Sequence, residues 1–215
     1  MEDKQIIASR IALELEDGNL VNLGIGIPSL VAEYVDKDKH ITFQAENGII
    51  GLGPFETEDT DTVNASGLKA SILKGGAFID SLMSFSLIRG GHIDVTVLGA
   101  LEVDSFGSIA SWIIPGKKVP GMGGAMDLVM GSKKVIIAMT HSNKGISKIV
   151  EKCSLPLTAY KQANLIVTEM CVIEVKEDGL YLKEVHPDYT TDQVINATSA
   201  KLNIKDVIPM KGIYL

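Results

Sequence analysis

The sequence predicts an α/β fold with an open, mainly parallel sheet, flanking helices and a β-rich C-terminal part. The first fifty residues follow the order helix, strand, helix, strand, and the strand–helix–strand portion is long enough for a right-handed crossover between parallel strands. Later in the chain, short apolar runs typical of buried strands become more frequent. No repeat, low-complexity segment or linker interrupts the 215 residues, so we expect a single domain over 1–215.

The first expected element is an amphipathic helix over residues 4–16. Ile7, Ile11 and Leu15 recur at a spacing of four, which places them on one face of a helix. Gly18 follows them, and glycine readily adopts the backbone conformation found just after a helix. We therefore expect this helix to bury one side against the rest of the domain.

Two sharp loops follow the first two expected strands. The expected elements are a strand over 20–23, a helix over 29–35 that begins at Pro28 or Ser29, and a strand over 41–45. The loops at 24–28 and 46–48 then lie at the carboxyl ends of parallel strands. Open α/β sheets bind their ligands at that edge, so these two loops are the first places to look for a site.

The rest of the chain is expected to be richer in strands. An acidic stretch at 56–61 is expected to be exposed. Expected strands lie at 93–98, 109–114, 134–139, 164–168, 172–175 and 180–184. The strand at 134–139 is apolar enough to be buried in the middle of a sheet, and the last two strands are joined around Gly179 as a hairpin. Thr191 is a plausible N-cap for a final helix.

Composition excludes several classes of function. The net charge of −7 and the absence of a dense Lys/Arg run argue against nucleic-acid binding. The longest apolar stretches are too short to cross a membrane, and the acidic N-terminus is neither a signal nor a transit peptide, so we expect a cytoplasmic protein. Cys153 and Cys171 stand apart from each other and from any metal-ligand cluster, which predicts two reduced thiols and no metal site.

Glu46 is the first candidate for chemistry. On the tripeptide Glu-Asn-Gly alone, an exposed turn acid is the commoner case. The residues around it, Gln44 and Ala45 before and a glycine-rich apolar segment after, raise the functional alternative. A poorly hydrated carboxylate is a better nucleophile, provided that a hydrogen-bond donor lies near to compensate. Both alternatives remain open on these residues.

A second glycine loop at 121–124 is the other candidate. Its three glycines allow the backbone to approach a ligand closely and to aim consecutive N–H groups at an anion, and a helix starting near Ala125 would add its dipole. A flexible turn between two strands is the alternative. The first glycine loop departs from a dinucleotide fingerprint, because Ser29 stands at the third glycine position and Pro28 intervenes, so NAD binding is rejected.

Two histidines lie next to polar loops. His92 precedes an expected strand, and His141 is followed by a polar turn. Neither has a carboxylate or nucleophile at a spacing that indicates general-base catalysis. A structural role is therefore the favoured interpretation for both.

Taken together, the motifs of this chain resemble the β subunit of class I (3-oxoacid) CoA-transferases, in particular those of the acetoacetate/butyrate and succinate types. The matching segments are VNLGIGIP (21–28), ENGIIGLGP (46–54), SFSLIRGGH (84–92), VLGA (97–100), WIIPGK (112–117), GMGGAMDLV (121–129) and KCSLPLT (152–158). Each segment is weak alone, but their order and separations are specific. The resemblance covers nearly the whole chain and implies the Rossmann-like superfold of this family.

The resemblance also implies roles for residues. The family pattern Ser-Glu-Asn-Gly contains the catalytic glutamate, so Glu46 is the expected nucleophile, although this chain has Ala45 in place of the serine. The expected oxyanion- and CoA-binding residues are Gly24, Gly26, Asn47, Gly123 and Gly124. CoA and acyl-CoA are then substrates, with no tightly bound cofactor. A homologous α subunit on a separate polypeptide is the expected partner, in an α2β2 hetero-oligomer.

The implied reaction is a ping-pong transfer of CoA between short-chain carboxylic acids through a glutamyl-CoA thioester on Glu46. Acetoacetate, butyrate, acetate and succinate are the kinds of acid that the resembling enzymes use in fatty acid metabolism. Two alternatives remain: an acyl-CoA hydrolase, in which water resolves the thioester, and a non-catalytic metabolite-binding domain of the same superfold. Dependence of turnover on an acceptor acid separates transferase from hydrolase.

Overall fold

The computed structural model describes residues 1–55, 61–117, 119 and 121–213, so the acidic stretch at 56–61 lies outside the described residues except for Asp61. The helices are α1 (Asp3–Ala12), the 3₁₀ helix η1 (Pro28–Tyr34), α2 (Ser81–Arg89), α3 (Ala125–Gly131) and α4 (Thr191–Ala197). The strands are β1 (Leu20–Leu23), β2 (Thr42–Ala45), β3 (Ile49–Phe55), β4 (Ala70–Phe78), β5 (Val95–Leu98), β6 (Glu102–Asp104), β7 (Ile109–Ala110), β8 (Lys134–Ala138), β9 (Ser142–Asn143), β10 (Ile146–Ser147), β11 (Ile149–Val150), β12 (Leu165–Val167), β13 (Cys171–Lys176), β14 (Gly179–Val185) and β15 (Leu202–Pro209). Within the described part of the chain, no helix has the length and apolarity needed to span a bilayer.

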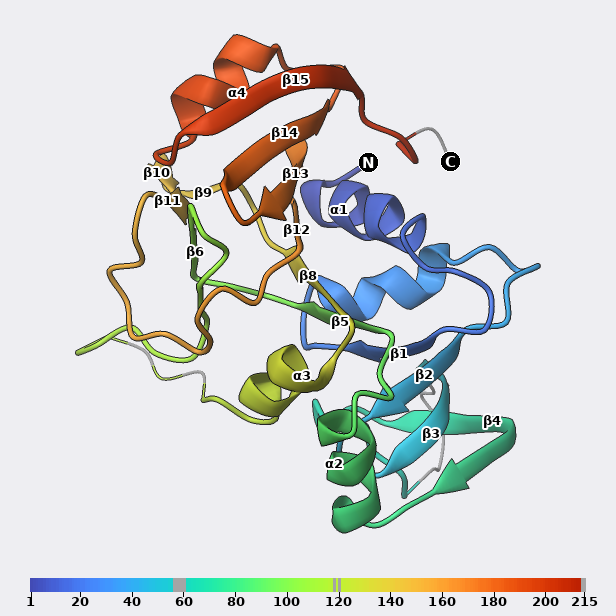
Figure 1. Ribbon diagram of the computed structural model, residues 1–215. Helices are drawn as coiled ribbons and strands as arrows, with labels where there is room; N and C mark the ends of the chain where they lie inside the picture. Colours follow the sequence, from blue (N-terminus) through green and yellow to red (C-terminus); the bar gives the residue numbers. More distant parts are fainter. Residues whose placement is uncertain (56–60, 118, 120, 214–215) are drawn as a thin grey trace.

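A ten-stranded sheet in the order β15-β14-β13-β12-β8-β5-β1-β2-β3-β4 forms the centre of the molecule (Figure 1). The neighbouring strands from β12 through β8, β5 and β1 to β2 are all parallel. Antiparallel pairs join β3 and β4 on one side and β13 and β14 on the other. The predicted α/β class, with a parallel centre and a β-rich C-terminal part, is confirmed.

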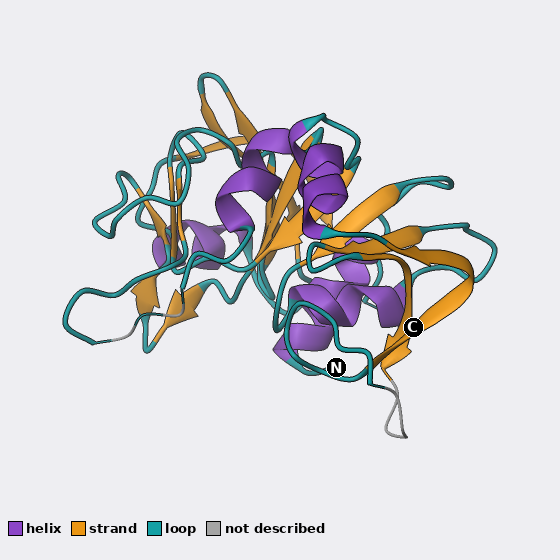
Figure 2. Cartoon of the chain, turned by 90° about the horizontal axis from the view of Figure 1, so that it is seen from below, coloured by secondary structure: helices purple, strands orange, loops and turns teal. Residues whose placement is uncertain are grey.

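Helices lie on both faces of this sheet (Figure 2). Alternation along β5 shows why: Val95 and Val97 pack into the cluster that contains α1 and η1, whereas Leu98 belongs to the cluster with α2 and α3. The same alternation divides β8, as expected for strands buried on both faces. Each apolar cluster therefore holds helices against one side of the parallel strands.

Several boundaries differ from the expectation, for local reasons. Helix α1 ends at Ala12 because the N–H groups of Leu13, Glu14 and Leu15 donate three residues back, which tightens the last turn before the loop. Leu15 is nevertheless fully buried, so the predicted apolar face is correct. The strand expected at 109–114 contains only β7, and the final helix is capped by Thr190 rather than Thr191, through a capping box with Gln193.

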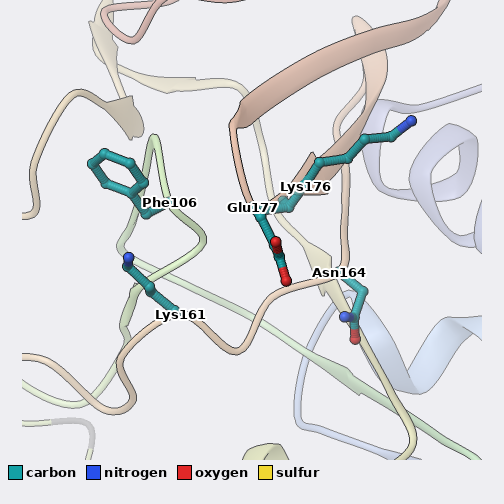
Figure 3. Close-up of a pocket in the computed structure, with 6 residues that line it drawn as sticks. Phe106, Lys161, Asn164, Lys176 and Glu177 are labelled. Atoms are coloured by element: carbon teal, nitrogen blue, oxygen red, sulfur yellow. The ribbon is translucent and has the colours of Figure 1, made fainter.

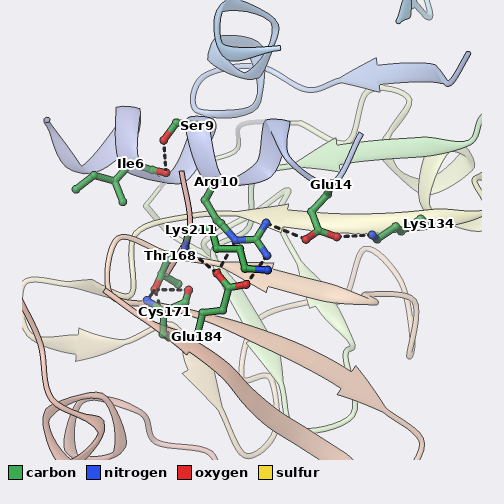
Figure 4. A network of polar contacts seen from close by, with 9 residues as sticks. All are labelled: Ile6, Ser9, Arg10, Glu14, Lys134, Thr168, Cys171, Glu184 and Lys211. Carbon is green, nitrogen blue, oxygen red and sulfur yellow. Dashed lines mark hydrogen bonds and ion pairs between the residues drawn. The ribbon is translucent and has the colours of Figure 1, made fainter. Parts of the chain in front are cut away.

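Buried charges fasten α1 to the sheet (Figure 4). The guanidinium of Arg10 donates to both carboxylate oxygens of Glu184 on β14, at 2.6 Å and 2.8 Å. Its Nη1 also lies 2.8 Å from Glu14, in an ion pair without hydrogen-bond geometry. Lys134 at the start of β8 donates to the other oxygen of Glu14 at 2.6 Å. Two strands and one helix are thus joined by one network of alternating charge.

Both cysteines are free thiols, as the sequence predicts. Cys171 is fully buried, and burial raises the pKa of its thiol to about 12. Burial also raises the pKa of Cys153 to about 12, with a further contribution from the neighbouring carboxylates Asp104 and Glu102. The thiolate is the reactive form, so both side chains are inert as nucleophiles near neutral pH.

Candidate active site

Glu46 directly follows β2, at the carboxyl edge of the parallel strands and beside the end of β1. Its turn requires a glycine: Gly48 has φ of +121°, and a Cβ there would collide with the carbonyl oxygen of Ile79. The N–H of Gly48 donates to Ala45 at 3.0 Å, which closes the turn between β2 and β3. The Asn-Gly step thus reverses the chain and leaves the half-buried Glu46 side chain at the sheet edge.

Polar groups from two other elements contact Glu46. The side-chain amide of Asn22 on β1 donates to Glu46 Oε2 at 3.2 Å. The hydroxyl of Ser84 on α2 donates to the backbone carbonyl of Glu46 at 2.8 Å, and Gln44 Nε2 donates to that hydroxyl at 2.9 Å. Sequence reasoning assigned no role in the site to Asn22, Gln44 or Ser84. A polar residue within each short buried segment is the signal that could have pointed to them.

The second glycine loop contacts Glu46, although the two segments are far apart in sequence. A Cβ added to Gly124 would lie 3.2 Å from Glu46 Cγ and 3.7 Å from Oε1, so a larger residue here would press on the Glu46 side chain. Gly123 has φ of +52° and Gly124 is the N-cap of α3. The alternative of a turn between two strands is therefore wrong, because the loop leads into a helix.

The other candidate residues already have local partners. The N–H of Gly24 donates to the Val97 carbonyl at 2.8 Å, and the amide of Asn47 donates to the Val63 carbonyl at 2.8 Å. Gly26 has φ of +87° and accepts from the hydroxyl of Ser29. All three belong to the two loops at the carboxyl edge. Their contact with CoA stays a prediction.

A shallow cavity of about 830 Å³ lies beside the second glycine loop, between α2 and α3. Gly123, Phe85, Arg89 and Asp127 are among its lining residues. Arg89 forms an ion pair with Asp127 at 2.7 Å and lies 5.5 Å from the centroid of the Phe85 ring. The cavity is open to the surface and includes Gly123 of the loop that approaches Glu46.

A separate cavity of about 720 Å³ is lined by Phe106, Lys161, Asn164, Lys176 and Glu177, together with Val175 (Figure 3). Asn164 precedes β12, so this cavity lies at the amino end of the parallel strands, opposite the edge that carries Glu46. The ammonium of Lys161 lies 4.8 Å from the centroid of the Phe106 ring. None of the predicted site residues lines this cavity.

The two histidines are not part of the Glu46 cluster. His92 is exposed, whereas His141 is fully buried, with Thr168 Oγ1 at 3.1 Å from Nδ1 and Thr198 Oγ1 at 2.9 Å from Nε2. Burial lowers the pKa of His141 to about 4, so the ring is neutral at physiological pH. The structural interpretation of His141 is confirmed.

Burial of neutral His141 makes stability depend on pH. The pKa of His141 is near 6.5 in the unfolded chain and about 4 in the folded chain. The contribution of the neutral ring to the free energy of unfolding is therefore complete above pH 6.5 and is lost as the pH falls toward 4. We expect the free energy of unfolding in urea to fall by about 2 kcal/mol between pH 7 and pH 5 from this group. His141→Gln, measured in parallel, should show a correspondingly flatter dependence. Equal slopes in the two proteins would contradict the assignment.

Comparisons with known proteins match this chain over nearly its whole length. A family model described as "Coenzyme A transferase" matches residues 4–197. The β subunit of the acetate CoA-transferase of Escherichia coli K12 is 50% identical over 205 residues, covering 95% of each chain. In the succinyl-CoA:3-ketoacid coenzyme A transferase of Helicobacter pylori 26695, the matching subunit is 43% identical over 206 residues, covering 94% of this chain and 99% of that protein.

A solved structure has the same fold. The acyl-CoA transferase YdiF of Escherichia coli O157:H7 superposes with a TM-score of 0.79 at 23% identity, over 98% of this chain and 44% of that one. The present chain therefore matches less than half of the length of the YdiF polypeptide. With the family model and the two subunits above, the matches place this chain in the coenzyme A transferase family, among the β subunits of the class I enzymes.

Proposed function

We propose that this protein transfers CoA between short-chain carboxylic acids by a ping-pong mechanism, with Glu46 as the nucleophile and in partnership with a homologous α subunit. The observation that carries the proposal is the contact between Glu46 and Gly124 at the carboxyl edge of the sheet. It brings a carboxylate against a loop of closely spaced backbone N–H groups. Among the described residues, none accepts a hydrogen bond from the N–H of Gly123 or Gly124, and we propose that these two groups donate to the oxyanion.

The chemistry proceeds in balanced steps. Glu46 attacks the carbonyl carbon of the acyl-CoA and expels CoA as the thiolate, which leaves an acyl-glutamyl anhydride. The thiolate then attacks the glutamyl carbonyl carbon and releases the first acid as a carboxylate, which leaves a glutamyl-CoA thioester. A second carboxylate reverses both steps and departs as its own acyl-CoA. Covalent catalysis divides the exchange into smaller barriers, and each addition develops an oxyanion.

The relatives named above support the substrate class. One is named for acetate and the other for succinyl-CoA and a 3-ketoacid. We propose a short-chain acid of this kind, such as acetate, butyrate, succinate or acetoacetate, as donor and acceptor. Ala45 is the last residue of β2 and is buried, so its lack of a hydroxyl removes one polar group next to Glu46.

The surface next to the site supports the partner. Leu82 and Met83 on α2 are 77% and 55% exposed, and Met126 and Met130 on α3 are 47% and 63% exposed. We call these four exposed side chains, on the two helices that flank the cavity beside Gly123, the apolar patch; Leu82 also lines that cavity. We propose that the α subunit covers this patch in an α2β2 assembly, which would also exclude water from Glu46 and so suppress hydrolysis.

The test is a mass measurement on the α/β complex. Incubation with acetyl-CoA and no acceptor acid should add the mass of CoA, less water, to the peptide that contains Glu46, and addition of acetoacetate or succinate should remove it as the new acyl-CoA forms. Turnover that needs no acceptor acid would instead indicate a hydrolase. Exchange activity without any adduct on this peptide would refute the proposed mechanism.

A further inference from the structure

A row of buried polar side chains crosses three neighbouring strands, β5, β1 and β2, which lie side by side in Figure 1. Asn22 on β1 is in register with Gln44 on β2 and with Thr96 on β5. The three residues are 0%, 2% and 0% exposed. Since Val21 and Leu23 pack against the α1 side, Asn22 between them faces the side of the sheet that α2 covers. Polar residues at the centre of a parallel sheet need a reason, because apolar ones would be expected there.

The hydrogen bonds around this row have only one possible direction. The backbone carbonyl of Glu46 can only accept, so the Ser84 hydroxyl donates its single hydrogen to it. The same hydroxyl must therefore accept a hydrogen bond from Gln44 Nε2. That fixes Gln44 Oε1 on the side of Asn22, where it accepts from Asn22 Nδ2 at 2.7 Å. The amide of Asn22 is therefore oriented with its NH₂ group toward Glu46, and its second N–H is shared between the Gln44 carbonyl and Glu46 Oε2, each at 3.2 Å.

This orientation leaves a buried acceptor without a partner. Asn22 Oδ1 has no hydrogen-bond partner among the described residues, and neither does Thr96 Oγ1 on the next strand. A buried, unsatisfied oxygen costs stability, so Asn22 is a poor choice for a central strand on folding grounds. The Nδ2 of Asn22 thus donates to Glu46, whereas its Oδ1 accepts from no described residue. That asymmetry points to a functional reason for the residue.

The two oxygens of Glu46 consequently have different surroundings. Oε2 faces the Asn22 amide, whereas Oε1 lies on the side of Gly124, 3.7 Å from where its Cβ would be. We infer that Asn22 is a catalytic residue of this chain, whose Nδ2–H holds Oε2 and stabilises the oxyanion that forms on it, while Oε1 is the attacking oxygen. The inference rests on the proposed role of Glu46 as nucleophile.

The fate of each oxygen follows from the atom balance. Oε1 forms the bond to the acyl carbon, and when CoA thiolate adds to the glutamyl carbonyl carbon, Oε1 leaves with the first acid. Oε2 stays, bears the negative charge of the tetrahedral intermediate, and becomes the carbonyl oxygen of the thioester. A hydrogen bond donated to Oε2 is therefore strongest in that intermediate. An interaction that is stronger there than in the ground state raises the rate of the step. At 3.2 Å, the contact between Asn22 Nδ2 and Oε2 can shorten as charge develops on Oε2.

The experiment measures how fast and how completely the α/β complex acquires CoA from acetyl-CoA, by acid quench and mass analysis of the Glu46 peptide. In Asn22→Ala we expect the rate of loading and kcat to fall about 10²- to 10³-fold, with the KM for acetyl-CoA and the final loaded fraction little changed. A merely structural role would lower the loaded fraction and the melting temperature instead. In Ser84→Ala the side-chain amide of Gln44 is no longer held in one orientation and can rotate by about 180°, so it no longer fixes the orientation of Asn22. We expect this variant to load about tenfold more slowly.

Thr96→Val is the matched control, because Thr96 lies in the same buried row and contributes an unpartnered hydroxyl but does not contact Glu46. It should load at the wild-type rate. Loading of Asn22→Ala at the wild-type rate, or equal slowing in Thr96→Val, would overturn the role of Asn22 while leaving Glu46 as nucleophile. Failure of the wild-type complex to form the adduct would overturn the proposed function, and this inference with it.

Discussion

Glu46→Gln is expected to lower the rate of CoA exchange by about 10⁴-fold or more, since removal of a covalent nucleophile leaves only binding and oxyanion stabilisation. Glutamine preserves the size of the side chain and an oxygen that can accept from Asn22, so the fold and the loops at 24–28 and 121–124 should persist. Steady-state exchange between acetyl-CoA and an acceptor acid, measured with the α/β complex, checks the expectation.

Glu33→Gln is the matched control for this substitution. Glu33 is exposed on η1, so the substitution removes the same charge from the surface of the protein. It should leave kcat and KM within about twofold of the wild type, as expected for a surface change away from special features. Exchange at the wild-type rate in Glu46→Gln would show that the carboxylate is not the nucleophile.

Arg10→Met is expected to cause the largest loss of stability of any single change in the charge network. Arg10 and Glu184 are each 5% exposed, so removing the guanidinium leaves a buried carboxylate without its bidentate partner. Breaking such a pair costs about 3–5 kcal/mol, which lowers the melting temperature by about 10 °C in a chain of this size. Urea and thermal unfolding of the variant against the wild type measure both quantities.

Two further variants test whether burial of the ion pair causes the loss of stability in Arg10→Met. The double variant Arg10→Met/Glu184→Met replaces the buried pair by apolar side chains of similar length, and it should recover most of the lost stability. Arg89→Met removes an ion pair of similar length, 2.7 Å to Asp127, but Arg89 is exposed. The melting temperature of this variant should therefore stay close to that of the wild type. Equal losses in Arg10→Met and Arg89→Met would show that desolvation does not govern the effect.

Helix α2 shows where sequence patterns mislead. Its apolar residues Leu82 and Met83 face outward, whereas the side chains it buries are Ser84 and Ile88. Apolar periodicity normally marks the buried face of a helix, and here much of it marks exposed surface. The expectation for this region was simply more β structure. The same inverted pattern produces the apolar patch proposed to lie against the α subunit.

Local chemistry in the sequence determined much of this protein. The order of helices and strands in the first fifty residues, the buried strand now seen as β8, the β13–β14 hairpin and the glycine-dependent turn at Gly48 follow from side-chain periodicity and backbone freedom, which act over a few residues. Glu46 and the 121–124 loop were likewise visible as candidates, because parallel strands present their carboxyl ends at one edge.

Only the tertiary structure decided which of these groups meet. The contact between Glu46 and Gly124 depends on how α3 packs against β5 and α2, and the direction of the Asn22 amide depends on Ser84, a residue of a third element. Strand register and helix docking are set by packing between segments distant in sequence, and a hydrogen bond acquires its direction from the whole ring of partners. For that reason Glu46 could be predicted from the sequence as a site residue, whereas the Asn22 donor that faces it could not.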